Sequence, residues 1–271
     1  MSAPSSPLRL VYQSMTDFRS VSAYAQALQR HAAAVVSAGT TVTFQGVRPE
    51  AYGALVPGDV FPYPYLKHLI QDEALESCWQ AAEQGADAFV IGSFSEPHLR
   101  QCRSAVDIPV LSLPASAFLA ACGLAERFAL VTLSPKYARR LSEVVERHDM
   151  AKRVAGLFPL GEDLTERELN EALTHPAPLL MLFEKAAAVA VAAGADLLIP
   201  AEGILNEVLY HQGIRHAAGA VVMDAVGVTL LDAERHVAMK RRLGLGVGRV
   251  WSYPMAPRAM TEEIRRRTRG D

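Results

Sequence analysis

Cysteine is scarce in this chain of 271 residues, which has three: Cys78, Cys102 and Cys122. Three cysteines cannot all pair within one chain, and each lies in an apolar pattern typical of a helix, which favours buried free thiols in a reducing compartment. The CxxC and HExxH spacings of common metal sites do not occur in the sequence. We therefore expect neither a disulfide framework nor a metal site.

Blocks of one charge and long apolar runs are also lacking. The formal net charge is −2, and its even spread gives no electrostatic reason to expect nucleic acid or an anionic membrane as a partner. We interpret the basic run at 265–269 as the solvated end of a last helix. Apolar runs such as 186–193 are shorter than the ~20 residues of a membrane span. The small, polar residues 1–7 predict a flexible arm and no signal peptide, so we expect a soluble, cytoplasmic protein.

The chain contains one stretch twice. Residues 85–93 (GADAFVIGS) recur as 194–202 (GADLLIPAE), and each copy reads as a helix that ends in Gly, a fully apolar strand, and a polar residue after that strand. Open parallel sheets bind their ligands at the carboxyl ends of their strands. Ser93 and Glu202 therefore occupy equivalent positions, and we expect them to face each other across one cleft.

Strand-like and helix-like segments alternate along nearly the whole chain. Eight short apolar or β-branched runs predict strands at 8–12, 41–44, 88–92, 109–113, 128–132, 154–158, 197–200 and 220–224. Helical patterns separate them, such as the apolar stripe in 66–82 and the capping box at 165–168. This alternation implies an α/β fold with parallel strands joined by right-handed helical crossovers.

A family resemblance rests on the order of several motifs. GADAFVIGSF, DIPVLSL, RFALVTLSPKY, GADLLIPAEG and VVMDAV follow one another as in the aspartate/glutamate/hydantoin racemase superfamily, which the chain resembles over about residues 8–242. The resemblance implies two pseudo-symmetric domains, each with a four-stranded parallel sheet flanked by helices, and a cofactor-independent active site between them. We expect 1–115 together with the C-terminal helices in 225–271 to form the first domain, and 116–224 to form the second.

The chain departs from this family at two positions that decide the chemistry. One cysteine ends the third strand of each half in the family, and the pair acts on opposite faces of a carbon acid; the matching positions here are Ser93 and Glu202. A thiol with a pKa near ~8.5 can act as acid and base at neutral pH, whereas an alkanol such as Ser93 cannot. The apolar residues before Glu202 are expected to raise the pKa of its carboxyl by desolvation. One-base chemistry through Glu202 is therefore favoured over two-base racemisation.

Other polar residues follow the first strand of each half and are candidates for substrate binding. Gln13, Ser14 and Thr16 follow the first strand, where family members place an Asn- and Thr-containing loop, so Gln13 is a further departure. Thr132 and Ser134 follow the fifth strand. Ser134 is a natural N-cap, and the free amides and dipole of the helix that it begins favour an anion such as a substrate carboxylate; capping alone also accounts for it. We predict that Gln13, Ser14, Thr132 and Ser134 bind substrate.

Two neighbouring segments admit structural explanations. Ser95 and Glu96 precede Pro97, and we expect them to cap a helix that this proline begins. The rigid aromatic segment 61–65 (FPYPY) either forms a wall of the pocket or packs against its own domain.

Polar residues that follow Glu202 are weaker candidates. His211 lies nine residues farther along the chain, so a helix would place it more than ~10 Å away, and we expect it at the surface. Asn206 and Glu207 are nearer, and they either support the site or occupy solvated helix positions.

These observations predict a cofactor-free isomerase or lyase acting on a small molecule. Glu202 would move a proton at a carbon next to a carboxylate or carbonyl, while Ser93 and backbone amides stabilise the enolate-like oxygen. A hydrolase in which Glu202 activates water against a cyclic amide or lactone is an alternative, and a non-catalytic binding protein is another. We expect a carboxylate or cyclic amide as the ligand, and a homo-oligomer is compatible with the sequence.

Overall fold

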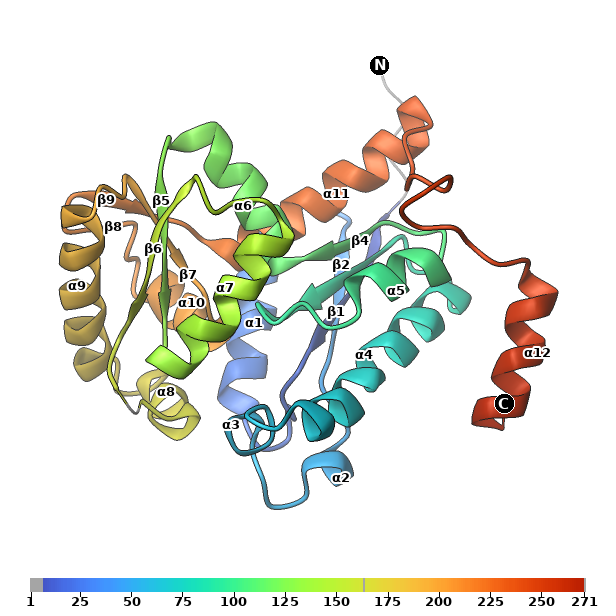
Figure 1. Cartoon of the computed structure of the whole chain (residues 1–271), viewed down its shortest axis with the longest axis horizontal. Coiled ribbons are helices and arrows are strands. Elements are labelled where there is room, and N and C mark those ends of the chain that lie inside the picture. The colour runs from blue at the N-terminus through green and yellow to red at the C-terminus, as the bar shows by residue number, and fades with distance from the viewer. Residues whose placement is uncertain (1–6, 163, 271) are drawn as a thin grey trace.

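The computed structural model describes residues 7–162 and 164–270, and these form two sheets that lie side by side (Figure 1). The first sheet has the order β2-β1-β3-β4 and is parallel throughout. The second has the order β6-β5-β7-β9-β8, in which β8 alone is antiparallel. The strands are β1 (Arg9–Ser14), β2 (Thr41–Gln45), β3 (Ala88–Gly92), β4 (Val110–Ser112), β5 (Phe128–Thr132), β6 (Val154–Pro159), β7 (Leu197–Pro200), β8 (His216–Ala217) and β9 (Ala220–Val222).

Each of the eight runs predicted from the sequence forms a strand, and β8 is an addition to the second sheet. Helices connect the strands and cover both sheets (Figure 1). They are α1 (Ser22–Val35), α2 (Pro49–Tyr52), α3 (Pro57–Val60), α4 (Pro64–Glu83), α5 (Leu99–Ala105), α6 (Leu113–Leu124), α7 (Pro135–Arg147), α8 (Glu166–Ala172), α9 (Ala177–Ala192), α10 (Gly203–His211), α11 (Ala225–Leu243) and α12 (Arg258–Arg269).

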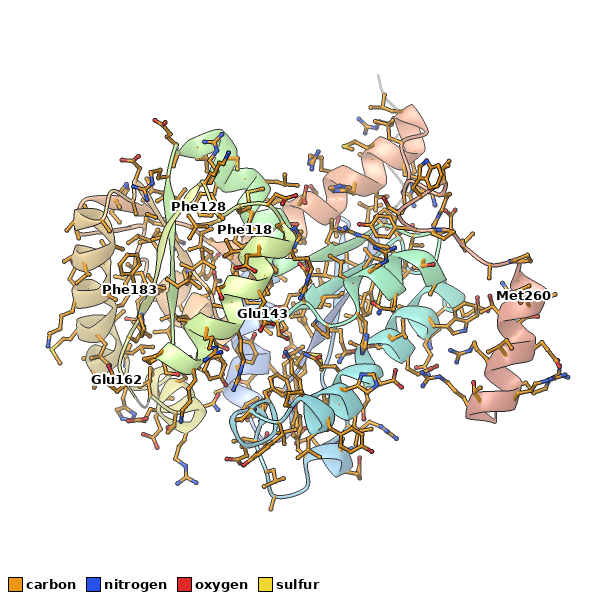
Figure 2. All side chains as sticks on the ribbon, viewed as in Figure 1. Phe118, Phe128, Glu143, Glu162, Phe183 and Met260 are labelled. Atoms are coloured by element: carbon orange, nitrogen blue, oxygen red, sulfur yellow. The ribbon has the colours of Figure 1, made fainter. Side chains whose placement is uncertain are left out.

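A continuous apolar core joins the two halves of the molecule, one built on each sheet. The central strands β3, β5 and β7 are buried along their whole length, as expected for a parallel sheet with helices on both faces. Phe118 on α6 stacks on Phe128 in β5, with ring centroids 5.8 Å apart, and Phe183 on α9 is buried in the same core (Figure 2). The shared core fixes the relative position of the two sheets, and therefore of the strand ends between them.

The C-terminal helices lie beside the first sheet. α11 packs on β3, β4 and α6, and we propose, on this contact, that residues 225–271 belong to the first domain. α12 has no buried residue and contacts α4 through ion pairs such as Arg265 with Glu76 (2.6 Å). Within the described residues, no helix combines the length and the apolar character that a membrane crossing requires.

The cysteines lie on helices, as predicted. Cys78 on α4 and Cys102 on α5 are buried, Cys122 on α6 is half-buried, and all three are free. The expected N-terminal arm, residues 1–7, falls outside the described residues except for Pro7, which is exposed.

Candidate active site

A cavity of about 130 Å³ lies between the two halves, and loops from both halves line it. Ser93 and Glu202 both line this cavity, Ser93 after β3 and Glu202 after β7. Tyr24 on α1 and several residues of α7 line it as well. The repeat in the sequence thus led to two residues that share one cavity.

Glu202 is held at the start of a helix. It is the N-cap of α10, and its Oε2 accepts a hydrogen bond from the Leu205 amide (2.8 Å). This bond and the helix dipole both stabilise a negative charge on the carboxylate. Glu202 is half-buried, whereas Ile204 and Leu205 are buried, so packing of α10 fixes the carboxylate at the cavity wall.

Ser93 belongs to a short series of neutral polar groups. Its Oγ lies 2.9 Å from the Ser95 Oγ and accepts a hydrogen bond from the Ser95 amide (3.2 Å). Ser95 Oγ in turn accepts from Gln71 Nε2 on α4 (3.1 Å). These contacts orient the Ser93 hydroxyl, but a serine hydroxyl and an amide are too weak as bases to remove its proton.

Two glycines allow tyrosine side chains to pass beside the site. A Cβ at Gly92, directly before Ser93, would overlap the Tyr12 ring, and a Cβ at Gly203, directly after Glu202, would overlap the Tyr24 hydroxyl. Burial raises the pKa of Tyr24 well above its usual value, so its hydroxyl remains protonated. A protonated, buried hydroxyl therefore lies next to the residue that follows Glu202.

Of the four predicted substrate-binding residues, Ser14 lines the cavity. Gln13 is buried behind it and donates from Nε2 to the Ser14 carbonyl (2.8 Å). Successive side chains of a strand point to opposite faces, which is why neighbours in β1 do not both reach the cavity. Thr132 is fully buried and does not line the cavity, and its Oγ1 has no hydrogen-bond partner among the described residues.

Ser134 differs from its predicted place in two respects. It precedes α7 as the N-cap residue, but its side chain makes no capping hydrogen bond. It lines a neighbouring hollow together with Tyr137 and Arg140, and not the cavity of Glu202. The prediction that Ser134 caps α7 through its hydroxyl is therefore wrong.

The aromatic segment 61–65 contributes one side chain to the cavity. It follows α3 and includes the first two residues of α4, and Phe61 is buried in the cavity wall. Tyr63 and Tyr65 are 60% and 71% exposed. Both interpretations of this segment thus hold in part, because Phe61 also packs in a small core of its own half.

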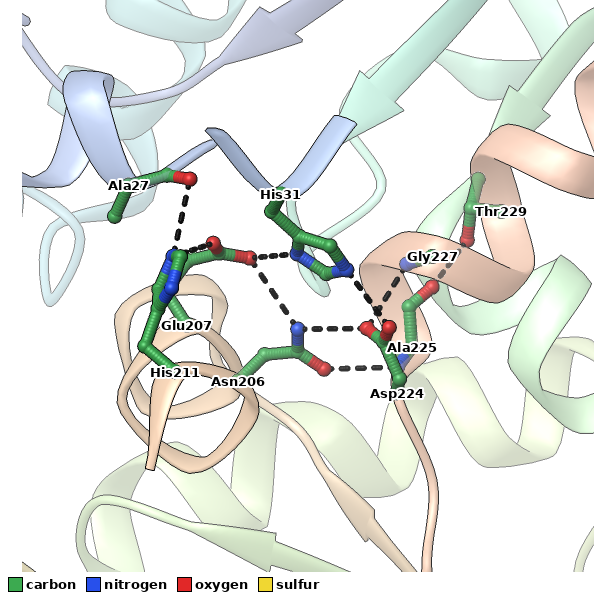
Figure 3. A network of polar contacts seen from close by, with 9 residues as sticks. All are labelled: Ala27, His31, Asn206, Glu207, His211, Asp224, Ala225, Gly227 and Thr229. Carbon is green, nitrogen blue, oxygen red and sulfur yellow. Dashed lines mark hydrogen bonds and ion pairs between the residues drawn. The ribbon is translucent and has the colours of Figure 1, made fainter. Parts of the chain in front are cut away.

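A buried polar network around His31 was not predicted from the sequence (Figure 3). His31 on α1 is fully buried, and its Nδ1 donates to Glu207 Oε1 (2.8 Å) while its Nε2 donates to Asp224 Oδ2 (2.7 Å). Burial alone would lower the pKa of His31, but the hydrogen bonds with Asp224 and Glu207 raise it to about 9. Burial likewise opposes ionisation of Asp224, yet the bond from His31 gives a net lowering of the pKa of that carboxyl. The network is therefore a charged imidazolium between two carboxylates.

Asn206 completes this network. Its Nδ2 donates to Asp224 Oδ1 (3.0 Å), and its Oδ1 accepts from the Ala225 amide (2.8 Å) (Figure 3). Asn206 and Glu207 are both buried, so the interpretation of these positions as solvated is wrong. His211 is at the surface as predicted, where it bonds to the Ala27 carbonyl (3.1 Å). The network ties α1, α10 and α11 together and fixes the helix that Glu202 caps.

Glu96, predicted to cap the helix after Pro97, is instead a buried carboxylate. α5 begins at Leu99 and not at Pro97, and Glu96 has a positive φ of 51°. Its carboxylate accepts from Ser112 Oγ (2.6 Å) and from His148 Nε2 (2.8 Å), a residue of the other half. Burial opposes ionisation of Glu96, but the bonds from His148 give a net lowering of its pKa. Glu96 therefore joins the halves and does not cap α5.

Within 7–162 and 164–270, no group of three or more His, Cys, Asp or Glu side chains could hold a metal ion.

A sequence model described as Asp/Glu/Hydantoin racemase matches residues 18–199. The chain belongs to this racemase family. The match includes β3, whose carboxyl end leads to Ser93, and it ends at Ile199 within β7, three residues before Glu202.

Individual relatives agree with this assignment. Over 107 residues the chain is 33% identical to a hydantoin racemase from Pseudomonas sp. (strain NS671), and the alignment spans 39% of this chain and 43% of the relative. The chain thus matches less than half of that relative's length. The structure of allantoin racemase from Pseudomonas fluorescens has a TM-score of 0.72 at 17% identity and covers 93% of this chain and 97% of its own. A liganded double mutant of arylmalonate decarboxylase has a TM-score of 0.54 at 17% identity, with 91% and 97% covered. Both structures share the fold.

Proposed function

We propose that this chain is a cofactor-independent isomerase or lyase in which Glu202 is the one base. The observation that carries the proposal is the position of a carboxylate and a hydroxyl, Glu202 and Ser93, on one cavity that loops after strands of both sheets line. Family membership supports proton transfer at carbon, and the fold neighbours named racemase and decarboxylase support both reaction classes. The steps of the reaction and the class of substrate are inferred below from the residues that line the cavity of this chain.

The proposed reaction begins with the Glu202 carboxylate removing a proton from a carbon next to a carboxylate or carbonyl group. The electron pair of the C–H bond moves into the adjacent C–O group, which becomes an enolate-like oxygen. The first amides of a helix have no acceptor within that helix, so Gly203 and Ile204, which line the cavity, can donate to this oxygen. Ser93 donates a further hydrogen bond. In an isomerisation, protonated Glu202 then delivers the proton to a different carbon of the delocalised enolate, or to the opposite face after the intermediate turns, because return to the same face of the same carbon would only regenerate the substrate. In a decarboxylation, Glu202 starts protonated: loss of CO₂ leaves the electron pair of the C–C bond in the enolate, Glu202 gives its proton to that carbon, and the carboxylate takes up a new proton from water before the next turnover.

The surroundings of Ser93 favour this one-base scheme. Two-base racemisation requires a base on each face of the carbon, and the groups bonded to Ser93 are the hydroxyl and amide of Ser95. Neither can take the serine proton at neutral pH. The Ser93 side is therefore suited to stabilising charge and not to transferring protons.

The volume of the cavity restricts the substrate. About 130 Å³ is close to the ~150 Å³ cavity that holds benzene in a protein interior. A small carboxylate or a five-membered cyclic amide fits such a volume. A peptide or a nucleotide does not.

Kinetics of two variants test the proposal. Glu202→Gln keeps an oxygen that can accept from the Leu205 amide but cannot take a proton, so kcat should fall by about 10²–10⁴ with little change in KM. Ser93→Ala should reduce kcat by less, because it removes one hydrogen bond and leaves the base in place. Glu146→Gln, an exposed position on α7, is the matched control and should keep the wild-type kcat. Unimpaired turnover by Glu202→Gln would sink the proposed mechanism.

A further inference from the structure

Three cationic side chains line the cavity. Lys67 comes from α4 in the first half, and Arg140 and Arg147 come from α7 in the second half. Two carboxylates also line the cavity: Glu202 at the carboxyl end of β7 and Glu143 on α7. Glu143, labelled on α7 in Figure 2, is exposed at the cavity mouth. The lining therefore has more positive than negative side chains, although the chain as a whole is slightly acidic.

The cations differ in how far the protein neutralises them. Arg147 lies 3.5 Å from Glu96 and is the one of the three that forms an ion pair within the described part of the chain. The Arg140 guanidinium lies over the Tyr137 ring, 5.1 Å from its centroid, a contact that leaves its charge intact. Arg140 and Lys67 thus present positive charge to the cavity.

The environment of Lys67 is unfavourable for its own charge. Burial lowers the pKa of Lys67, the nearby Arg140 and Arg147 lower it further, and Glu143 offsets part of this effect. Like charges held together in a partly buried site are stabilised when an anion binds between them. A compact anion next to Lys67 and Arg140 would supply the missing negative charge.

These cations are separate from the reaction centre. Glu202 and Ser93 lie at strand ends, whereas Lys67 and Arg140 lie on helices that flank the same cavity. A substrate with its reacting carbon next to Glu202 can therefore direct a second group toward the helices. Phe61 lines the cavity too, which adds apolar surface for the part of the substrate between its two ends.

We propose that Lys67 and Arg140 form a carboxylate-binding subsite, so that the enzyme selects small substrates with a second acidic group away from the reacting carbon. This inference rests on the proposed function for its reaction centre, but the subsite is defined by Lys67 and Arg140 alone. It makes the two residues determinants of specificity and leaves proton transfer to Glu202.

Binding of two ligands of equal size tests the subsite without any turnover. Succinate and succinamate differ in one carboxylate, and isothermal titration calorimetry gives their dissociation constants. The wild-type protein should bind succinate about tenfold more tightly, the ratio expected for one charged hydrogen bond. Lys67→Met and Arg140→Met should each reduce this preference to about twofold or less. Arg139→Met, an exposed neighbour on α7, should retain it.

Salt provides a test that needs no variant. The affinity of the wild-type protein for succinate should fall more steeply between 50 and 500 mM NaCl than its affinity for succinamate, because screening weakens the additional charge contact. Equal affinities for the two ligands, no binding of succinate, or an unchanged preference in folded Lys67→Met would each overturn the subsite. Succinate binding through Lys67, without exchange at carbon in any substrate, would instead contradict the proposed function and leave the subsite standing.

Discussion

The buried network around His31 should dominate the pH dependence of stability. In His31→Leu, the carboxylates of Glu207 and Asp224 lose the imidazolium that lies 2.8 and 2.7 Å from them. Raising the pKa of His31 from 6.5 to about 9 corresponds to roughly 3 kcal/mol in favour of the protonated folded state, at about 1.36 kcal/mol per pKa unit. Removing one partner from a buried ion pair costs a similar amount, about 3–5 kcal/mol.

The sign of this effect follows from the direction of the shift. Because the pKa of His31 is higher in the folded protein than in the unfolded chain, its contribution is fully present below about pH 6.5 and is lost as the pH rises toward about 9. Urea unfolding of the wild type and of His31→Leu should therefore differ by about 3 kcal/mol at pH 6 and by much less at pH 9.5. His175→Leu, an exposed histidine bonded to Thr174, is the matched control and should change stability little at either pH. A difference between wild type and His31→Leu that does not depend on pH would refute the charged network.

Two further predictions concern packing and thiols. Gly203→Ala should destabilise the protein by about 1–3 kcal/mol in thermal unfolding, because the new Cβ would overlap the Tyr24 hydroxyl. Gly123→Ala in α6 has open space around the new Cβ and should be neutral or stabilising. Equal effects of the two substitutions on stability would contradict the close contact at Gly203. Iodoacetamide should leave activity intact under native conditions, because the cysteines lie on helices and Cys78 and Cys102 are buried; rapid inactivation that substrate prevents would show a thiol in the site.

Most of the fold could be predicted because the buried strands of a parallel sheet appear in the sequence as continuous apolar runs. The segments that became β3 and β7 are such runs, and the repeat fixed their equivalence. The two-residue strand β8 is too short to leave a pattern, and its pairing with β9 depends on the tight connection through Gly219. Pro97 predicts the start of a helix, but a proline begins a helix only when the residues after it continue the helical backbone. α5 begins at Leu99 instead.

The candidate site was predictable only where a strand end determines position. Glu202 and Ser93 follow central strands, so their place at the cavity follows from topology. The partners of His31 lie 176 and 193 residues away, and contacts over such separations leave no local signal in a single sequence. The buried state of Glu207 has the same origin, since α1 of the other half covers α10. From the sequence alone, a charged residue on a helix is expected to face solvent. The burial of Glu207 becomes evident only from the position of α1 over α10.

Deuterium incorporation at carbon tests the central claim most directly. Wild-type enzyme and Glu202→Gln are incubated in D₂O with the same small carboxylates and cyclic amides, and product and recovered substrate are analysed by mass spectrometry and NMR. We expect the wild type to place deuterium on the carbon next to the carboxylate or carbonyl group, and Glu202→Gln to reduce the rate of this labelling by about 10²–10⁴. Product labelled only at exchangeable positions, as hydrolysis would give, or labelling at carbon that is equally fast in Glu202→Gln, would contradict proton transfer at carbon by Glu202.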